Sequence, residues 1–386
     1  MTSTDATGGG VSLLDPYDAV LLVSFGGPEK PADVLPFLEN VTRGRGIPPE
    51  RLAEVAEHYH HFGGRSPIND QCRSLLAALR TELDRRGIGV PLFWGNRNWK
   101  PHLADTAAEL FAAGHRRVLA LTTSAYPSYS SCRQYREDFY DAVADRPLTI
   151  DRIRHYATHP GFVTASVNAT LAALDALGDH AARARLIFVT HSIPAAMSAT
   201  AGPEPRTSTA AYVDWHAAVA AEVTRRVERR RGIPYRHELA YCSRSGTPQQ
   251  PWLEPDIVER LSSLKAAGCS GVVVVPIGFV SDHMEVVFDL DTEAAQRAAE
   301  LGLGFARAAT AGTHPAFVEA LADLLCERAA VARDEVTEPA VIDGDEPGWY
   351  SCQPTCCPNL RDPNRLSLCQ LTTAASSGNS GRSFAL

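Results

Sequence analysis

The sequence predicts an α/β protein of two similar Rossmann-like domains, each with a parallel four-stranded sheet flanked by helices. Short apolar runs that suit buried parallel strands alternate with helical patterns along the chain. Four such runs fall in each half, and this alternation is typical of parallel sheets with right-handed crossovers. The length, 386 residues, is sufficient for two domains with sizeable cores.

The first half is expected to form a domain over residues 16–160, after a disordered tail at 1–15. Its clearest strand reads Ala-Val-Leu-Leu-Val-Ser and ends at Gly26-Gly27-Pro28. The expected strands are 19–24, 90–94, 117–122 and 151–156. The expected helices are 31–40, 49–60, 68–86, 102–113 and 133–144.

The second half repeats this pattern over residues 161–312. The expected strands are 185–190, 237–242, 271–276 and 304–309. The expected helices are 161–177, 208–231, 255–267, 282–300 and 314–333. Residues 358–386 are expected to be mostly a disordered tail, because the chain is rich in Ser, Thr, Ala and Gly from about 371 onward.

Composition excludes several classes of function. The net charge is −8 and there is no basic amphipathic helix, so no nucleic-acid partner is expected. The chain has no G-x-G-x-x-G after a strand and no Walker lysine, which argues against a nucleotide. No apolar run approaches the roughly 20 residues of a membrane span, and the first residues lack a signal-peptide pattern. We expect a cytoplasmic protein whose nine cysteines are not paired in disulfides.

The stretch at 271–293 combines a buried strand with a run of acidic residues. If the chain becomes helical after Ser281, then Glu285, Asp289 and Glu293 are spaced i, i+4, i+8 on one face. A hard cation would offset their repulsion, whereas a solvated acidic face is the commoner explanation of such a run. In an open α/β sheet, however, ligands bind where strands end. This favours a functional role, most strongly for Glu285.

His191 directly follows another apolar strand and therefore lies at a strand's carboxyl end. A neutral imidazole there can act as a general base or a metal ligand, while the alternative is a structural histidine. The aromatic loop at 126–135 suits either packing or a planar ligand. Arg43, Arg45 and Arg65 suit ligand carboxylates, although a solvated surface position is the simpler explanation for each.

Cys352, Cys356 and Cys357 form a group in a proline-bounded loop. With one distant cysteine they would supply four thiolates to an iron–sulfur cluster or to structural zinc, and free thiols are the third alternative. Zinc sites usually show two separated cysteine pairs, so the spacing favours iron–sulfur.

Five motifs, taken in order, resemble the ferrochelatases, specifically the actinobacterial branch that carries a 2Fe-2S cluster. The resemblance extends from about residue 19 to residue 357. The motifs are LVSFGGP at 22–28, GGRSPI at 63–68, THSIP at 190–194, YCSRSG at 241–246 with PWL at 251–253, and PIGFVSDHME at 276–285. The resemblance implies two chelatase-type domains with a porphyrin cleft between them, and a terminal segment at 313–357 that returns to the first domain.

The resemblance also assigns roles to residues. His191 matches the active-site histidine and Glu285 its partner, while Asp289 and Glu293 match an acidic path for iron. Ser66 and Tyr135 match positions that contact the porphyrin. The implied ligands of the 2Fe-2S cluster are Cys132, Cys352, Cys356 and Cys357, with Cys369 in reserve. Phe25 departs from the tyrosine of many Gram-positive relatives, so that an axial oxygen is absent there.

The implied reaction inserts Fe²⁺, the metal substrate, into a porphyrin. The segment at 39–46 is polar and includes Arg43 and Arg45, which suits the water-soluble tetracarboxylate coproporphyrin III. Protoporphyrin IX is the alternative porphyrin. A cobalt or nickel tetrapyrrole chelatase and a non-catalytic haem or iron–sulfur sensing module are the alternative functions. We expect a monomer with transient contacts to neighbouring haem-pathway enzymes.

Overall fold

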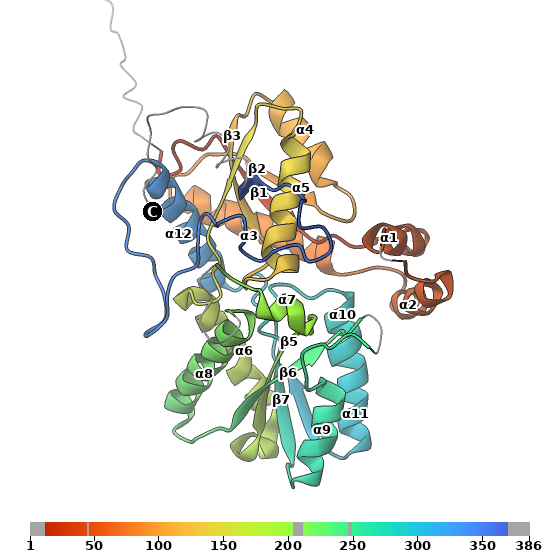
Figure 1. The fold of residues 1–386 in the computed structure, drawn as a ribbon. Coiled ribbons are helices and arrows are strands. Elements are labelled where there is room, and N and C mark those ends of the chain that lie inside the picture. The colour runs from red at the N-terminus through yellow and green to blue at the C-terminus, as the bar shows by residue number, and fades with distance from the viewer. Residues whose placement is uncertain (1–11, 45, 204–210, 246–248, 370–386) are drawn as a thin grey trace, which may run out of the picture.

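The computed structural model describes residues 12–44, 46–203, 211–245 and 249–369, and it contains two parallel four-stranded sheets (Figure 1). The strand orders are β2-β1-β3-β4 and β6-β5-β7-β8, so the second sheet repeats the topology of the first. This confirms the predicted fold class. Of the expected tails, residues 1–11 and 370–386 lie outside the described residues.

The first sheet is organised around β1 (Ala19–Ser24), whose six residues are all buried. Its register pairs Ser24 with Asn96 on β2, so both strands end at the same edge. The other strands are β2 (Leu92–Asn96), β3 (Arg117–Thr122) and β4 (Thr149–Arg152). The helices are α1 (Val34–Val41), α2 (Pro49–His61), α3 (Ile68–Arg85), α4 (Leu103–Ala112) and α5 (Gln134–Val143). Strand β4 begins and ends earlier than the predicted 151–156, because its pairing with β3 runs from Thr149 to Arg152.

The second sheet places β5 (Arg185–His191) next to β7 (Gly271–Val275), and both are buried along almost their whole length. The outer strands are β6 (His237–Cys242) and β8 (Gly304–Arg307). The first helices are α6 (Pro160–Leu177), α7 (Ala195–Ala199), α8 (Ala211–Arg231) and α9 (Ile257–Ala266). They are followed by α10 (Met284–Val286), the π-helix η4 (Val287–Ala294), α11 (Ala295–Glu300) and α12 (Pro315–Ala332).

The two domains share one core. The largest hydrophobic cluster includes Leu22 and Leu121 of the first sheet together with Phe188 and Val275 of the second. Helix α12 packs against α6 of the second domain and α3 of the first. The relative position of the two sheets is therefore held by apolar burial, which makes the space between their strand ends a defined one.

Helix α6 and the turn after it, Pro160–Arg183, are long and apolar enough to cross a membrane by length and composition alone. The prediction that no run of this kind exists was therefore wrong. Half of this apolar window is buried, and α6 packs against α8, α12 and β7. The apolar composition thus serves a helix that is covered on several sides.

Helices α1 and α2 form a pair that contacts the second domain. Phe37 and Tyr59 pack in one cluster with Met284. The ring of His58 stacks on Phe288, with 3.8 Å between centroids and 9° between planes. Through these side chains the helix pair, which projects to one side of the molecule in Figure 1, touches the segment that follows β7.

Candidate active site

His191 is the last residue of β5, the central strand of the second sheet. Its backbone is held from two sides: the hydroxyl of Tyr212 donates to the His191 carbonyl at 2.9 Å, and the Ser192 N–H donates to the Cys242 carbonyl at 2.8 Å. The side chain is 33% exposed. The imidazole thus projects from a fixed strand end into accessible space, as the sequence predicted.

The imidazole of His191 faces the carboxylate of Glu285, with 3.5 Å between Nε2 and Oε2. His191 Nδ1 lies in close contact with the Ser192 carbonyl oxygen. Because a carbonyl only accepts, Nδ1 carries the hydrogen and Nε2 of the neutral ring presents its lone pair. The Nε2 lone pair of His191 and the carboxylate oxygen of Glu285 are both acceptors, so they attract one another only when a proton lies between them. The His191–Glu285 pair is therefore arranged to receive a proton.

The turn after β7 brings Glu285 to His191. The Gly278 N–H donates to the Val189 carbonyl at 3.1 Å, which ties the turn to β5. A Cβ at Gly278 would lie 2.1 Å from Thr190 Oγ1, so only glycine permits this approach. The amide N–H of Asp282 then donates to Gln71 Oε1 of the first domain at 2.8 Å.

A second histidine flanks Glu285. His283 Nδ1 lies 3.8 Å from Glu285 Oε2, so the carboxylate is placed between two imidazoles. Burial lowers the pKa of His283, although the Glu285 charge acts in the opposite direction. His283 is not among the site residues predicted from the sequence. Its position two residues before Glu285, directly after the turn, was the available signal.

The acidic helix begins at Met284 and is π-helical over Val287–Ala294, a geometry the sequence analysis did not predict. Single π-turns occur frequently at functional sites. Burial, together with the charges of Glu285 and Glu293, raises the pKa of Asp289 to about 7, although a hydrogen bond from Ser243 acts in the opposite direction. Burial also raises the pKa of Glu293. Asp289 therefore exchanges a proton near neutral pH.

Ser243 and Arg307 hold this acidic helix and were missed by sequence reasoning. Ser243 follows β6 with φ = 59°, a left-handed conformation that is costly for a residue with a side chain. Arg307, the last residue of β8, contacts Asp291 at 2.5 and 2.9 Å and Asp282 at 3.1 and 3.4 Å. One guanidinium thus links residues on both sides of Glu285.

Of the predicted porphyrin-contact residues, Ser66, Tyr135 and Arg43 are described, and none of the three has a hydrogen bond or ion pair to His191 or Glu285 in the described part of the chain. Tyr135 is 4% exposed and packs in the core of the first sheet, with the Arg97 guanidinium 4.6 Å from its ring centroid. Arg43 is exposed after α1 and has no side-chain hydrogen bond or ion pair within the described residues. Arg45 lies outside the described residues. Ser66 is 3% exposed and donates its N–H to the Pro28 carbonyl at 2.9 Å.

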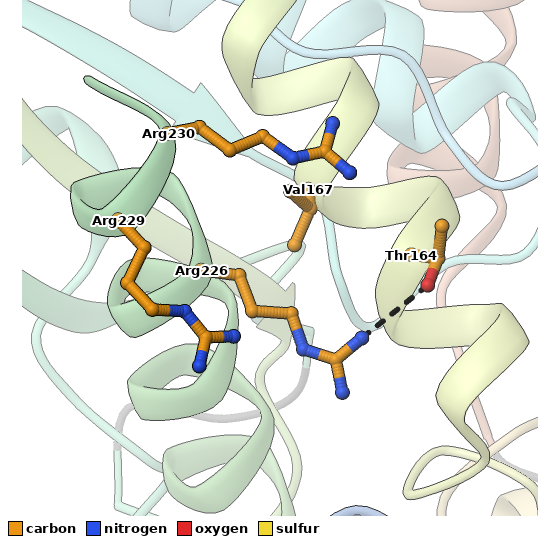
Figure 2. Close-up of a pocket in the computed structure, with 5 residues that line it drawn as sticks. All are labelled: Thr164, Val167, Arg226, Arg229 and Arg230. Carbon is orange, nitrogen blue, oxygen red and sulfur yellow. Dashed lines mark hydrogen bonds between the residues drawn. The ribbon is translucent and has the colours of Figure 1, made fainter.

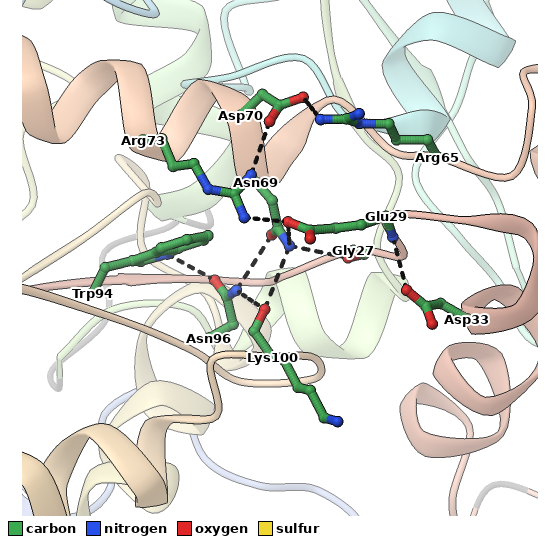
Figure 3. A network of polar contacts seen from close by, with 10 residues as sticks. All are labelled: Gly27, Glu29, Asp33, Arg65, Asn69, Asp70, Arg73, Trp94, Asn96 and Lys100. Atoms are coloured by element: carbon green, nitrogen blue, oxygen red, sulfur yellow. Dashed lines mark hydrogen bonds and ion pairs between the residues drawn. The ribbon is translucent and has the colours of Figure 1, made fainter.

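A polar network secures the loop that carries Gly27. The buried Asn69 donates to the Gly27 carbonyl at 3.2 Å and to Glu29 at 3.1 Å (Figure 3). Asn96, at the end of β2, donates to Asn69 at 3.3 Å. Figure 3 shows these side chains converging from α3, β2 and the loop. The strand end of the first sheet is therefore a rigid, hydrogen-bonded surface.

The cysteines of the C-terminal loop gather around Cys132. Cys132, Cys356 and Cys357 are buried together, with Cys352 packed against them. Hydrogen bonds from the thiols of Cys352 and Cys357 hold the pKa of Cys132 well below its usual range. Cys369 joins the group: a hydrogen bond from Cys352 lowers the pKa of Cys369 to about 6.

Basic side chains attach this loop to the first domain. Arg133 donates to the Pro354 carbonyl at 2.6 Å, and Arg136 to the Tyr350 carbonyl at 3.1 Å. Residues 358–369, expected within the tail, are described, and Asn359, Ser367 and Cys369 are buried. Across the described residues, no three His, Cys, Asp or Glu side chains are grouped so as to hold a single metal ion.

Comparisons with known proteins show the family to which the chain belongs. The family model described as Ferrochelatase matches residues 17–329. Coproporphyrin III ferrochelatase of Streptomyces griseus is 51% identical over 351 residues, covering 89% of this chain and 94% of that protein. The protein of the same name from Frankia alni is 49% identical and covers 94% of this chain and 92% of its own.

Among solved structures, SirB from Bacillus subtilis with Fe3+ covers 82% of this chain and 97% of its own, at 12% identity and a TM-score of 0.48. That similarity is too low to carry an argument about this chain. The family match and the relatives near 50% identity are decisive: the chain belongs to the ferrochelatase family.

Proposed function

We propose that this protein inserts Fe²⁺ into coproporphyrin III to give the iron porphyrin of haem synthesis. The observation that carries the proposal is the 3.5 Å approach of His191 Nε2 to Glu285 Oε2 at the strand ends of the second domain. The names of the relatives from Streptomyces griseus and Streptomyces coelicolor support the porphyrin.

The reaction exchanges two pyrrole N–H protons for one Fe²⁺ without a change in oxidation state. His191 accepts one proton at Nε2, where the carboxylate of Glu285 stabilises the imidazolium that forms, and it releases this proton to solvent before it accepts the second. Glu285 in turn lies within 3.8 Å of His283 Nδ1, which gives the carboxylate a second neighbour. Before it takes a proton, the free Nε2 lone pair of His191 can bind Fe²⁺ together with the Glu285 carboxylate, and two such ligands leave the metal free to pass to the porphyrin nitrogens.

Asp289 and Glu293 form the proposed path for iron. Asp289 has a pKa raised to about 7, so an arriving cation displaces a proton at little cost near neutral pH. The hydroxyl of Ser243 holds one Asp289 oxygen. The path then leads along the π-helix to Glu285.

For the porphyrin, the supporting feature is the polar segment after α1. Arg43 is exposed and its guanidinium has no partner within the part of the chain that the structure describes. A guanidinium of this kind suits a propionate, and coproporphyrin III carries four of them. Ser66 and Tyr135 remain proposed porphyrin contacts through the resemblance alone.

We further propose that the gathered thiols hold a 2Fe-2S cluster. The donor set fits: the Gly202 N–H contacts Cys357 Sγ at 3.1 Å and Arg136 contacts Cys352 Sγ at 3.6 Å, and such donors favour thiolates. Cys132, Cys352, Cys356 and Cys357 are the proposed ligands, and Cys369 is the fifth thiol at the site. A redox-neutral insertion does not need this group, whose ligands would fasten the C-terminal loop to the first domain.

The test is an anaerobic insertion assay with Fe²⁺ and either coproporphyrin III or protoporphyrin IX, followed by the absorption spectrum of the product. We expect a higher kcat/KM with coproporphyrin III. A preference for protoporphyrin IX, or insertion of only Co²⁺ or Ni²⁺, would refute the assignment.

For the cluster, Cys356→Ser is expected to lose the visible absorbance of the purified protein, while the control Cys269→Ser retains it. An unchanged spectrum in Cys356→Ser would contradict this ligand set.

A further inference from the structure

A cavity of about 240 Å³ between α6 and α8 is lined by three arginines, Arg226, Arg229 and Arg230, together with Thr164 and Val167 (Figure 2). The arginines are spaced i, i+3, i+4 on α8, which places them on one face of the helix. They lie near the carboxyl end of α8, which leads back to the start of β6. His191 lies at the opposite, carboxyl end of the sheet, so this cavity is separate from the candidate active site.

The positive charge in the cavity is only partly compensated. Arg226 pairs with Glu222 at 2.5 Å, but Arg225 shares that carboxylate at 2.6 Å. Arg230 donates to the neutral amide oxygen of Asn168 at 2.9 Å. Neither Arg229 nor Arg230 has a carboxylate partner among the described residues. In a chain of net charge −8, this local excess of guanidinium groups is unusual.

The helix dipole explains part of this arrangement. Cations near a helix carboxyl terminus are stabilised, and Arg229, Arg230 and Arg231 occupy the last turn of α8. The dipole favours cations at this end of α8, but it does not explain why the arginine side chains extend to α6. Figure 2 shows Arg226 extending to Thr164 of α6, with Arg230 extending toward the same helix beside Val167. The three arginines thus line one cavity, in which Arg229 and Arg230 are exposed to solvent and accessible to a dissolved anion.

We propose that this cavity binds a phosphate group, either inorganic phosphate or the phosphate of a small monoester. Two guanidinium groups without carboxylate partners match the charge of a phosphate dianion, and their planar donors suit its oxygens. The volume lies below the roughly 300–1,000 Å³ typical of pockets for drug-sized ligands, which favours a small anion over a peptide. A phosphate bound here would link α6 to α8.

The test is thermal melting and calorimetric titration of the full chain with potassium phosphate, against potassium chloride at equal ionic strength. We expect phosphate to raise the melting temperature and to give saturable binding. Arg229→Ala and Arg230→Gln should each weaken phosphate binding by about tenfold, equivalent to about 1.4 kcal/mol. The matched control is Arg183→Ala, an exposed arginine of the same domain, which should bind like the wild type.

Three outcomes would overturn the proposal: an equal response to chloride, an unchanged affinity in Arg229→Ala, or acetate binding as tightly as phosphate. Glycerol 3-phosphate identifies the source of the phosphate group. Tighter binding of the monoester than of inorganic phosphate indicates a phosphorylated metabolite, and equal binding indicates free phosphate. The site is independent of metal insertion, so failure of either proposal leaves the other standing.

Discussion

The two sheets have the same topology but use their strand ends differently. Strand β1 occupies in the first sheet the place that β5 occupies in the second. β1 ends at the buried Ser24, whose hydroxyl accepts a hydrogen bond from Thr123 at 2.9 Å. β5 ends at His191, which faces Glu285. One central strand therefore ends in a buried, uncharged hydroxyl and the other in an accessible imidazole beside a carboxylate, although the same architecture forms both.

The largest expected effect tests this difference directly. His191→Ala should lower kcat by about 10²–10⁴, the usual range for a general acid–base group, with little change in melting temperature. Ser24→Ala at the matching position should do the reverse, costing about 1 kcal/mol of stability while kcat is retained. Insertion rates and thermal melting of both variants measure the contrast. If His191→Ala inserted iron at the wild-type rate with porphyrin binding intact, the assignment of His191 as the proton acceptor would be wrong.

The second prediction concerns the turn that delivers Glu285. Gly278→Ala places a methyl group 2.1 Å from Thr190 Oγ1, so the turn or β5 must shift. Such overpacking should cost about 1–3 kcal/mol and lower kcat as well. Gly89→Ala is the control, because a Cβ there meets nothing within 4 Å. Urea unfolding and the insertion assay give the two readouts, and equal behaviour of the two variants would show that the turn is adaptable.

The third prediction concerns the guanidinium that links the two sides of Glu285. Arg307→Met removes the partner of both Asp282 and Asp291. We expect kcat to fall by about tenfold, equivalent to about 1.4 kcal/mol, while KM for the porphyrin is unchanged. The reason is that Glu285 would be oriented less well but would still be present to contact the substrate. Arg297→Met, which removes an ion pair with Glu300 and a hydrogen bond to Ser262 but contacts neither Asp282 nor Asp291, should retain kcat. A change confined to KM would argue against a positioning role.

The smallest expected effect is the pH dependence of stability from Asp289. Its folded pKa, raised to about 7, lies above the ordinary value of 3.8, so the folded state favours the protonated carboxyl. The stability contributed by that proton is complete below pH 3.8 and is lost as pH rises toward and through 7. Asp289→Asn should therefore melt higher than the wild type at pH 8 and nearly equally at acid pH. Parallel pH profiles of the two proteins would contradict this.

The order of apolar runs was enough to predict the two sheets, because buried parallel strands need continuous apolar segments and β5 and β7 consist of them. The same reasoning placed His191 at a strand end and Glu285 in the helical segment that follows β7. Membrane-like apolarity in α6 and the burial of residues 358–369 were not anticipated. Both depend on what packs against those residues, which a single sequence does not contain.

Local spacing by itself determined the strands, the acidic run and the cysteine group, since those features join residues close in the chain. Only the tertiary structure decided that His283 flanks Glu285, that Arg307 links Asp282 to Asp291, and that three arginines of α8 line a cavity beside α6. The physical reason is that these are contacts between separate elements, or depend on how a turn is held against a neighbouring strand. Their geometry follows from the packing of the whole core.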